Sequence, residues 1–564
     1  MLHCGPVDKA DLQAYTVTTM DNIYLQRRYL ISFESRRLPY IFTDVLVLGA
    51  GVAGLRAALE ACEHGQAIVL TKGKLPESNS YYAQGGMAAV MDAADDVANH
   101  ICDTMTTGNG LSDEEVVRYV ISQAPEQVVQ MQRWGVEFDI QGEGLSLGRE
   151  GAHSAARVVH ADGDATGRVL TEALIRRAQI AKGIKIFEEC FAIDLLTDGQ
   201  NGGACVGALT YHPRYGLQVI RAKQTILAAG GAGMLWRETS NPPNATAGAV
   251  GLAFRAGAAL SDMEMVQFHP TTLYVAGSTR SLVSEAVRGE GGKLIDRKGN
   301  RFMPDYHELA ELAPRDVVSR AILQQMAKTV STHVFLDVRH MAEGLFSQRF
   351  PHIAAQCLSF GIDPGRDPIP VHPAAHYMIG GAKVDLNGQT TVPGLRACGE
   401  ASCTGLHGAN RLASNSLTEA LVLGRRAGEA AGRSLSEAGN RMTADRIDWL
   451  AERSERTELD LADVRNSLRS VMWRNVGIAR RGERLAESIE IINFWGRYVM
   501  DKEFFDPAGW EVQNMLTAAY LIAECSLRRT ETRGVHYRED FPQTDPVWAR
   551  HQIVRRTAHQ LVVE

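Results

Sequence analysis

The sequence lacks any pair of cysteines at the Cys-x-x-Cys spacing, although it contains nine cysteines. Their number is odd and they are scattered from Cys4 to Cys525, which argues against a disulfide framework and against a structural metal site. Scattered, unpaired thiols are typical of proteins from reducing compartments. We therefore expect reduced cysteines, no bound metal and a cytoplasmic location.

Long runs of one kind are also absent. No uninterrupted apolar stretch approaches the ~18 residues that would indicate a membrane span. The formal net charge is −7 and no long basic run interrupts it, which argues against a nucleic-acid-binding surface. Residues 1–42 contain several arginines but no apolar core of a secretory signal, so we expect an N-terminal extension ahead of the fold.

Glycine, in contrast, is abundant, with 53 in 564 residues, and its clearest pattern follows a short apolar run. Val45–Leu48 predicts a strand, the next six residues a turn into a helix, and Ala67–Leu70 a parallel return strand. In such a β-α-β unit phosphates bind at the helix N-terminus. We predict dinucleotide binding by the turn residues Gly49, Ala50, Gly51, Val52, Ala53 and Gly54.

The acid that usually holds the ribose in such a unit is missing. About 20 residues after the turn, where that acid is expected, the chain has Val69 and Leu70. Thr71 and Lys72 follow instead. This weakens the case for NAD and leaves FAD open, with Lys72 available for a phosphate or a sugar edge.

Two later loops suit a flat, wrapped cofactor. Residues 78–86 combine hydroxyls and an amide with paired glycines, and residues 397–401 present Glu400 as a candidate partner of a ribityl or ribose hydroxyl. A polar turn before a helix is the alternative interpretation of residues 78–86.

The run 408–417 holds one cation, Arg411, among small residues and two asparagines. Small side chains let a backbone approach a flat ligand, and one Arg can bind a carboxylate through two hydrogen bonds. The alternative is a helix N-terminus with Asn or Ser capping and an ordinary surface Arg. The run by itself does not decide between the two.

Together with further motifs, this run resembles the flavoprotein family of succinate dehydrogenase, fumarate reductase and L-aspartate oxidase. The similarity follows the family order over residues 44–430, and residues 532–542 resemble the end of the helical domain of aspartate oxidases. Within the family, the L-aspartate oxidases are the most similar. The motifs are Ser80–Gly86, Arg149–Ser154, Asp164–Arg168, Gln267–Pro270, Glu285–Gly291, Arg301–Pro304, Leu312–Asp316 and Pro373–Tyr377.

The resemblance implies FAD-dependent oxidation of L-aspartate to iminoaspartate, the first step of quinolinate and NAD biosynthesis. A hydride would pass from C2 to flavin N5, O2 or fumarate would reoxidise the flavin, and the product would pass to quinolinate synthase. Asn79 stands where membrane-bound relatives have the His that bonds FAD covalently, so FAD is expected to be non-covalent. Because soluble fumarate reductases also lack that bond, a soluble fumarate reductase is the alternative.

Site residues follow from matched positions. His269, His376 and Arg411 match the family's carboxylate-binding set, and Ser284 offers a hydroxyl where the family commonly has Thr. Glu143, six residues before Arg149, resembles the acid that orients the amino group of aspartate. The FAD contacts implied, besides the glycine turn, are Lys72, Asn79, Ser80, Tyr81, Tyr82, Ala83, Gln84, Gly85, Gly86, Glu400, Ser416 and Leu417.

Arg315 matches the family's active-site Arg and is the acid/base candidate. Because an Arg normally stays protonated, the alternative is an electrostatic role with a proton path through Glu285 and Arg288. One position departs from the family: Gly248 replaces an Asp that touches FAD, and Asn244 is a candidate to compensate.

The resemblance also implies an α/β architecture. We expect a Rossmann-like FAD-binding domain in two pieces, residues 43–262 and 378–447, with an α+β capping domain inserted at 263–377. From about residue 448 to 545 the pattern is that of amphipathic helices, so residues 448–564 would form a C-terminal helical bundle and tail. Closure of the cap would complete the site and exclude water.

Overall fold

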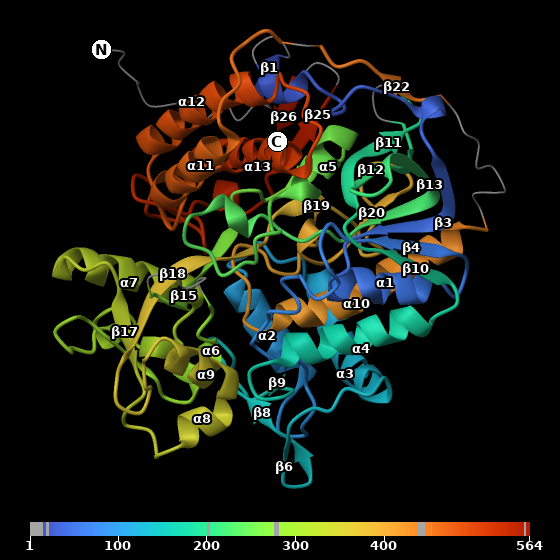
Figure 1. Ribbon diagram of the computed structural model, residues 1–564. Coiled ribbons are helices and arrows are strands. Elements are labelled where there is room, and N and C mark those ends of the chain that lie inside the picture. The colour runs from blue at the N-terminus through green and yellow to red at the C-terminus, as the bar shows by residue number, and fades with distance from the viewer. Residues whose placement is uncertain are drawn as a thin grey trace, which may run out of the picture.

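A computed structural model describes residues 15–18, 22–199, 203–275, 281–436, 446–452, 454–557 and 560–564. Three groups of elements are visible in Figure 1: a sheet with helices beneath it, a smaller unit to one side, and a layer of helices above. The fold combines helices with parallel and antiparallel sheets, as the predicted α/β class requires.

The glycine turn follows a strand of a seven-stranded sheet. Strand β3 (Tyr40–Leu48) pairs in parallel with β4 (Ala67–Leu70), and helix α1 (Val52–Ala61) connects them. This confirms the predicted β-α-β unit, although β3 begins at Tyr40, earlier than the apolar run indicated. The remaining strands are β10 (Ile184–Phe187), β11 (Phe191–Thr197), β12 (Cys205–His212), β13 (Gly216–Leu227) and β20 (Leu395–Ala397). The neighbouring strands β10, β4, β3 and β13 run parallel to one another.

Helices α1 and α10 (Asn415–Ser434) cross beneath this sheet, with α4 (Thr166–Ile180) beyond them (Figure 1). Glycines allow the close approach: a Cβ on Gly424 would lie 2.7 Å from the carbonyl oxygen of Ala53, and one on Gly428 would collide with that of Ala57. Helices α2 (Val97–Thr107) and α3 (Glu114–Arg133) pack outside α10. The N-termini of α1 and α10 thereby come close to the same pocket.

The smaller unit at one side is built on a four-stranded antiparallel sheet. Its strands are β15 (Val266–Leu273), β16 (Lys293–Ile295), β17 (Val334–Asp337) and β18 (Ile369–Met378). Its helices are α6 (Glu285–Gly289), α7 (Arg315–Thr329), α8 (Leu345–Arg349) and α9 (Pro351–Ser359). Strand β15 follows β14 (Leu260–Ser261) and strand β18 precedes β19 (Gly381–Lys383), two paired strands of a separate six-stranded sheet.

The C-terminal region contains helices α11 (Leu461–Asn475), α12 (Gly482–Val499) and α13 (Pro507–Arg528), as the amphipathic pattern predicted. Helix α13 packs against α5 (Gly248–Ala256). Beyond it the chain returns as β25 (Ile553–Arg556) and β26 (Gln560–Val563), and β25 pairs with β14 (Leu260–Ser261). The end of the chain therefore joins β14 in a mixed six-stranded sheet.

The N-terminal segment differs from the expected extension. Residues 1–14 and 19–21 lie outside the described residues, but β1 (Tyr15–Thr18) pairs with β26, and residues 22–39 pack against the fold. Tyr24 stacks on Tyr520 at 4.6 Å between ring centroids. The guanidinium of Arg27 donates to four backbone oxygens, three of them in residues 452–502. These buried contacts come from residues far apart in sequence, so the local pattern did not reveal them.

Candidate functional site

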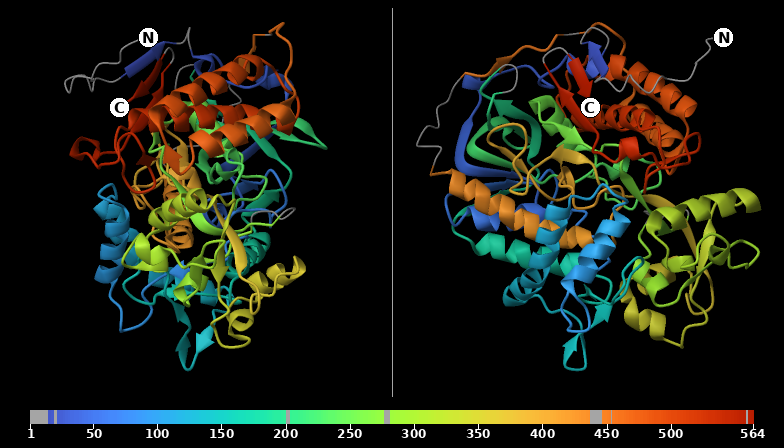
Figure 2. Two further views of the ribbon diagram at one scale, coloured as in Figure 1. Left: turned by 90° about the vertical axis from the view of Figure 1, so that its left-hand side faces the viewer. Right: turned by 180° about the vertical axis from the view of Figure 1, so that it is seen from behind.

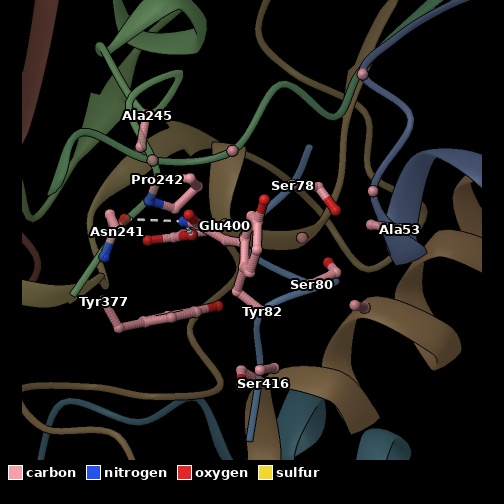
Figure 3. A pocket seen from close by; sticks show the side chains of 18 of the residues that line it. Ala53, Ser78, Ser80, Tyr82, Asn241, Pro242, Ala245, Tyr377, Glu400 and Ser416 are labelled. Atoms are coloured by element: carbon pink, nitrogen blue, oxygen red, sulfur yellow. Dashed lines mark hydrogen bonds between the residues drawn. The ribbon is translucent and has the colours of Figure 1, made fainter. Parts of the chain in front are cut away.

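A long pocket runs from the glycine turn of the large sheet to the seam with the smaller unit. Figure 3 shows Ser78, Ser80 and Ala53 on one wall, Asn241 and Pro242 on the opposite one, and Tyr82 and Glu400 between them. Tyr377 and Ser416 lie toward the other end in the same view. Segments from both halves of the chain therefore form one cavity.

The glycine turn forms the floor at one end of the pocket. Gly49 has φ +117°, and a Cβ there would collide with the carbonyl of Ala228 on the neighbouring loop. Gly51 is the N-cap of α1, and the backbone N–H of Val52 donates to Ser80 Oγ at 3.3 Å. A helix N-terminus with free N–H groups suits a phosphate. Gly49, Ala50, Gly51 and Ala53 line the pocket, whereas Val52 and Gly54 lie behind it.

The loop 78–86 lines the pocket at every position except Tyr81, whose hydroxyl donates to Glu172 at 3.3 Å. Asn79 Nδ2 donates to Asn241 Oδ1 at 2.8 Å and to Glu400 Oε2 at 2.9 Å. Burial raises the pKa of Glu400 to about 7. The oxygens of Asn79 Oδ1 and Gln84 Oε1 are buried without a hydrogen-bond partner, which indicates that a ligand with donor groups completes this loop.

Lys72, a predicted FAD contact, already has hydrogen-bond partners within the protein. Lys72 lines the pocket, but its ammonium donates to Thr246 Oγ1 at 2.7 Å and to Glu511 Oε1 at 2.6 Å. Burial lowers the pKa of this ammonium, and Glu511 partly restores it. Helix α13, which carries Glu511, therefore fixes one wall of the cofactor end.

The opposite end of the pocket collects the predicted cations and imidazoles. His269 comes from β15, Ser284 precedes α6, Arg315 begins α7 and His376 lies on β18, while Arg411 belongs to the loop before α10. Burial, followed by Arg315, lowers the pKa of both imidazoles well below its ordinary value. Both histidines are therefore neutral, and His269 Nε2 is buried without a partner.

Arg411 is held by neutral groups. Its guanidinium donates to Gln267 Oε1 at 3.2 Å and to Ser416 Oγ at 3.1 Å, and it lies 4.6 Å from the centroid of the Tyr377 ring. Burial, and after it Arg315, lowers the pKa of Arg411 to about 10. It remains a cation at neutral pH. Behind it, Glu419 accepts a hydrogen bond from the Tyr377 hydroxyl at 2.8 Å.

Glu285 lies between two arginines. It pairs with Arg315 Nε through one oxygen and lies 3.2 Å from Arg288 Nη2 through the other. Burial raises the pKa of Glu285, but Arg315 and Arg288 lower it by more, so the group is an anion. Arg288 is itself buried behind the pocket and does not line it. The three side chains form a continuous path from the pocket to the interior of the smaller unit.

The structure does not bring Glu143 to the pocket. Glu143 lies in the exposed turn between β6 (Ile140–Gln141) and β7 (Gly144–Leu145), a hairpin that projects from the molecule (Figure 1). Glu150 lines the pocket instead, accepts a hydrogen bond from Ser414 Oγ at 2.7 Å and leaves Oε1 without a partner. Burial, then Glu285, raises the pKa of Glu150. The only sequence signal for Glu150 was its place inside the motif Arg149–Ser154.

The position that departs from the family pattern also faces the cavity. Gly248, at the start of α5, lines the pocket, and a Cβ there would meet nothing within 4 Å. Asn244 lines the same wall, but its amide donates to the backbone oxygen of Glu77. Ser416 and Leu417 line the pocket as well, at the N-terminus of α10.

Within the described residues, no group of three or more His, Cys, Asp or Glu side chains is arranged so that it could hold a metal ion. Each helix that the structure describes is too short or too polar to cross a membrane.

Comparison with known families places this geometry in context. Residues 44–417 match a family described as FAD binding domain, and residues 465–564 match one described as fumarate reductase flavoprotein C-term. An L-aspartate oxidase of Streptomyces coelicolor is 41% identical over 534 residues, covering 91% of this chain and 92% of the relative. The chloroplastic L-aspartate oxidase of Arabidopsis thaliana is 42% identical over 550 residues, covering 91% of this chain and 83% of the relative.

Solved structures give the same picture. An E. coli quinol fumarate reductase superposes with a TM-score of 0.86 at 31% identity, covering 93% of this chain and 97% of the other. Mycobacterium smegmatis Sdh1 superposes with a TM-score of 0.78 at 30% identity, covering 93% of this chain and 94% of the other. The similarity extends over the larger sheet, the smaller unit and the C-terminal helices alike.

Proposed function

The chain belongs to the L-aspartate oxidases of the FAD-binding flavoprotein family, and from this premise we propose how its pocket recognises and oxidises L-aspartate. The overall reaction is the FAD-dependent oxidation of L-aspartate to iminoaspartate. The observation that carries the proposal is the set of unpaired groups at one end of the pocket. His269 Nε2 and Glu150 Oε1 are buried there without partners, beside two guanidinium groups.

The cofactor end fits FAD. Close backbone approach at Gly49 and the N-terminus of α1 at the pocket suit the phosphates of a flavin dinucleotide, and the unpaired oxygens of Asn79 and Gln84 suit its donor groups. Glu400 would hold a ribityl or ribose hydroxyl, and Ser416 and Leu417 would contact the flavin. When bound, FAD accepts the two electrons that leave the substrate with a hydride. We propose that it binds without a covalent bond, because Asn79 has no nucleophilic ring nitrogen.

The two carboxylates of the substrate require fixed donors. We propose that Arg411 and His376 hold one end, and His269 and Ser284 the other, because these side chains converge at the seam of the pocket. Neutral imidazoles donate hydrogen bonds without adding a charge that would need a counter-ion. Holding the substrate in one orientation supplies much of the rate, as in other reactions that depend on alignment.

Glu150 supplies what a site for a dicarboxylate alone would not need. An ammonium group requires an anion, and Glu150 Oε1 is available for it. The raised pKa of Glu150 also makes its carboxylate a stronger base, able to take a proton from the ammonium and expose the nitrogen lone pair. Arg315 stabilises the negative charge of the substrate carboxylates. Glu285 and Arg288 would carry a proton from the pocket toward the interior of the smaller unit.

The arrangement of the chain supports the same proposal. We propose that residues 43–262 and 378–447 form the FAD-binding domain, residues 263–377 the cap, and residues 448–564 the C-terminal domain. Fumarate or O2 would reoxidise the flavin, and the similarity to fumarate reductases supports fumarate as an acceptor. The product would pass to quinolinate synthase in the cytoplasm.

Replacing Glu150 by Gln tests the assignment of the amine site. The variant keeps the size of the side chain but removes the anion that pairs with the ammonium. We expect kcat/KM for L-aspartate to fall by at least about tenfold, the effect of ~1.4 kcal/mol or more, while succinate binding is retained or strengthened. Succinate binding is read from the perturbation of flavin absorbance. Unchanged turnover of L-aspartate in the Glu150→Gln enzyme would refute the assignment.

A further inference from the structure

Gln267 contacts both cations at the substrate end of the pocket. Its amide oxygen accepts from Arg315 Nη1 at 3.1 Å and from Arg411 Nε at 3.2 Å. Its amide nitrogen donates to Asn410 Oδ1 and to the backbone oxygen of Arg411, both at 2.8 Å. The side chain is completely buried and does not line the cavity. All its hydrogen-bonding capacity is therefore used to hold the two guanidinium groups and the loop of one of them.

Asn410 continues the connection to the helix that carries the other cation. Its amide nitrogen donates at 2.9 Å to Asp316 Oδ1, and Asp316 directly follows Arg315 at the start of α7. Asp316 also pairs with Arg320 at 2.8 Å. The contacts form a closed ring that joins α7, strand β15 and the loop before α10. Because these elements belong to both sides of the seam, the ring is complete only when the two sides are together.

The neutrality of this acceptor has an electrostatic consequence. Two guanidinium groups that share one oxygen repel each other, and Arg315 is among the causes that lower the pKa of Arg411. A carboxylate at position 267 would relieve that repulsion but would also neutralise charge that the substrate needs. An amide oxygen supplies the same geometry without a charge. The pocket thus keeps a positive potential for an anionic ligand.

We propose that Gln267, supported by Asn410, is a positioning residue that fixes the spacing of Arg315 and Arg411 and leaves their combined charge available to a dicarboxylate. This inference rests on the proposed function, since it assumes that the two arginines face the carboxylates of the substrate. Gln267 would thus influence the affinity for dicarboxylates although its side chain lies outside the cavity.

Two replacements of Gln267 separate charge from shape. Gln267→Glu keeps the length and the acceptor but adds a negative charge, whereas Gln267→Met keeps the length and removes the acceptor. In FAD-loaded enzyme, the Kd of succinate should rise in the order wild type, Gln267→Met, Gln267→Glu, with at least about a tenfold increase for Gln267→Glu. The KM for L-aspartate should rise in the same order, by more than kcat falls.

Gln325→Glu serves as the matched control. Gln325 lies on the same helix as Arg315 but outside the pocket, where it forms hydrogen bonds with Tyr306 and Asp296. This variant should leave the Kd of succinate unchanged. The inference is overturned if Gln267→Glu binds succinate as tightly as wild type, or more tightly than Gln267→Met. Failure of the proposed function would show separately, as a wild-type flavin that L-aspartate does not reduce, and would leave the succinate comparison readable.

Discussion

Burial determines the charge state of individual side chains in the pocket. His269 and His376 are neutral because the interior and the neighbouring Arg315 disfavour imidazolium. Glu285 is anionic because Arg315 and Arg288 flank it, whereas Glu150 and Glu400 have raised pKa values because burial dominates. Neighbouring carboxyl groups therefore differ in the direction of their pKa shifts according to what surrounds them.

Glu400 gives a pH dependence that can be measured without substrate. Its pKa is about 7 in the fold against an ordinary 4.5, so the folded state holds this proton more tightly than the unfolded state. The corresponding stability is fully present below pH 4.5 and is lost as the pH rises through about 7. The full difference is about 3 kcal/mol, since one pKa unit corresponds to ~1.4 kcal/mol.

The measurement is urea denaturation of FAD-free protein at pH 5 and pH 8, for wild type and for Glu400→Gln. The loss of stability toward pH 8 should be smaller in the variant, because the amide does not titrate. An identical pH dependence in both proteins would contradict the assignment.

Most of the predicted site residues line the pocket, but Glu143 does not. Glu143 and Glu150 are separated by a short stretch of chain, and nothing in the local pattern shows which of them turns inward. The fold decides, because the hairpin that carries Glu143 projects into solvent while Glu150 packs beside Ser414. Gln267 was missed for a related reason: its motif was recognised, but its hydrogen bonds join residues 48 and 144 positions away.

At the level of elements, glycines bring α1 and α10 close enough for their N-termini to reach one ligand. Gly424, Gly428 and Gly432 repeat at a spacing of four on α10, and each would place a Cβ against α1 or the residues that follow it. That spacing is visible in the sequence. Its partner is not, because α1 is more than 350 residues away.

Gly428→Ala tests this contact. The added methyl group would collide with the backbone oxygen of Ala57, which cannot rotate away. We expect a loss of about 1–3 kcal/mol in the free energy of unfolding together with weaker FAD binding, since the N-terminus of α1 shifts. Gly144→Ala is the control, because a Cβ there meets nothing within 4 Å and should change stability by less than about 0.5 kcal/mol. Equal stability of the two variants in denaturant titrations would contradict the role of Gly428.

Across the whole molecule, residues 22–39 and the C-terminal strands are joined to the body of the fold. The sequence predicted the C-terminal helices from their periodicity, but neither the burial of residues 22–39 nor the return of β25 to β14. Short strands and isolated polar contacts carry little local pattern. Their partners lie hundreds of residues away, so only the assembled fold defines them.

Arg529 is the centre of the C-terminal attachment. It is fully buried and pairs with Glu264 at 2.6 Å and with Glu531 at 3.0 Å. Arg529→Met would leave the buried carboxylate of Glu264 without its arginine partner, while Glu531 would keep Arg533, so we expect a loss of about 3–5 kcal/mol in the free energy of unfolding. Arg528→Met, at the adjacent and more exposed position, should cost less than about 1 kcal/mol. Calorimetry that finds similar melting temperatures for both variants would contradict this account.

The most direct test of the central claim is the flavin absorbance of FAD-loaded protein mixed with L-aspartate or with succinate in the absence of oxygen. The pocket described above predicts that L-aspartate bleaches the oxidised flavin, because Glu150 can bind the ammonium and deprotonate it, whereas succinate binds and perturbs the spectrum without reducing the flavin comparably. A flavin that stays oxidised with L-aspartate, or that succinate bleaches equally fast, would contradict the account.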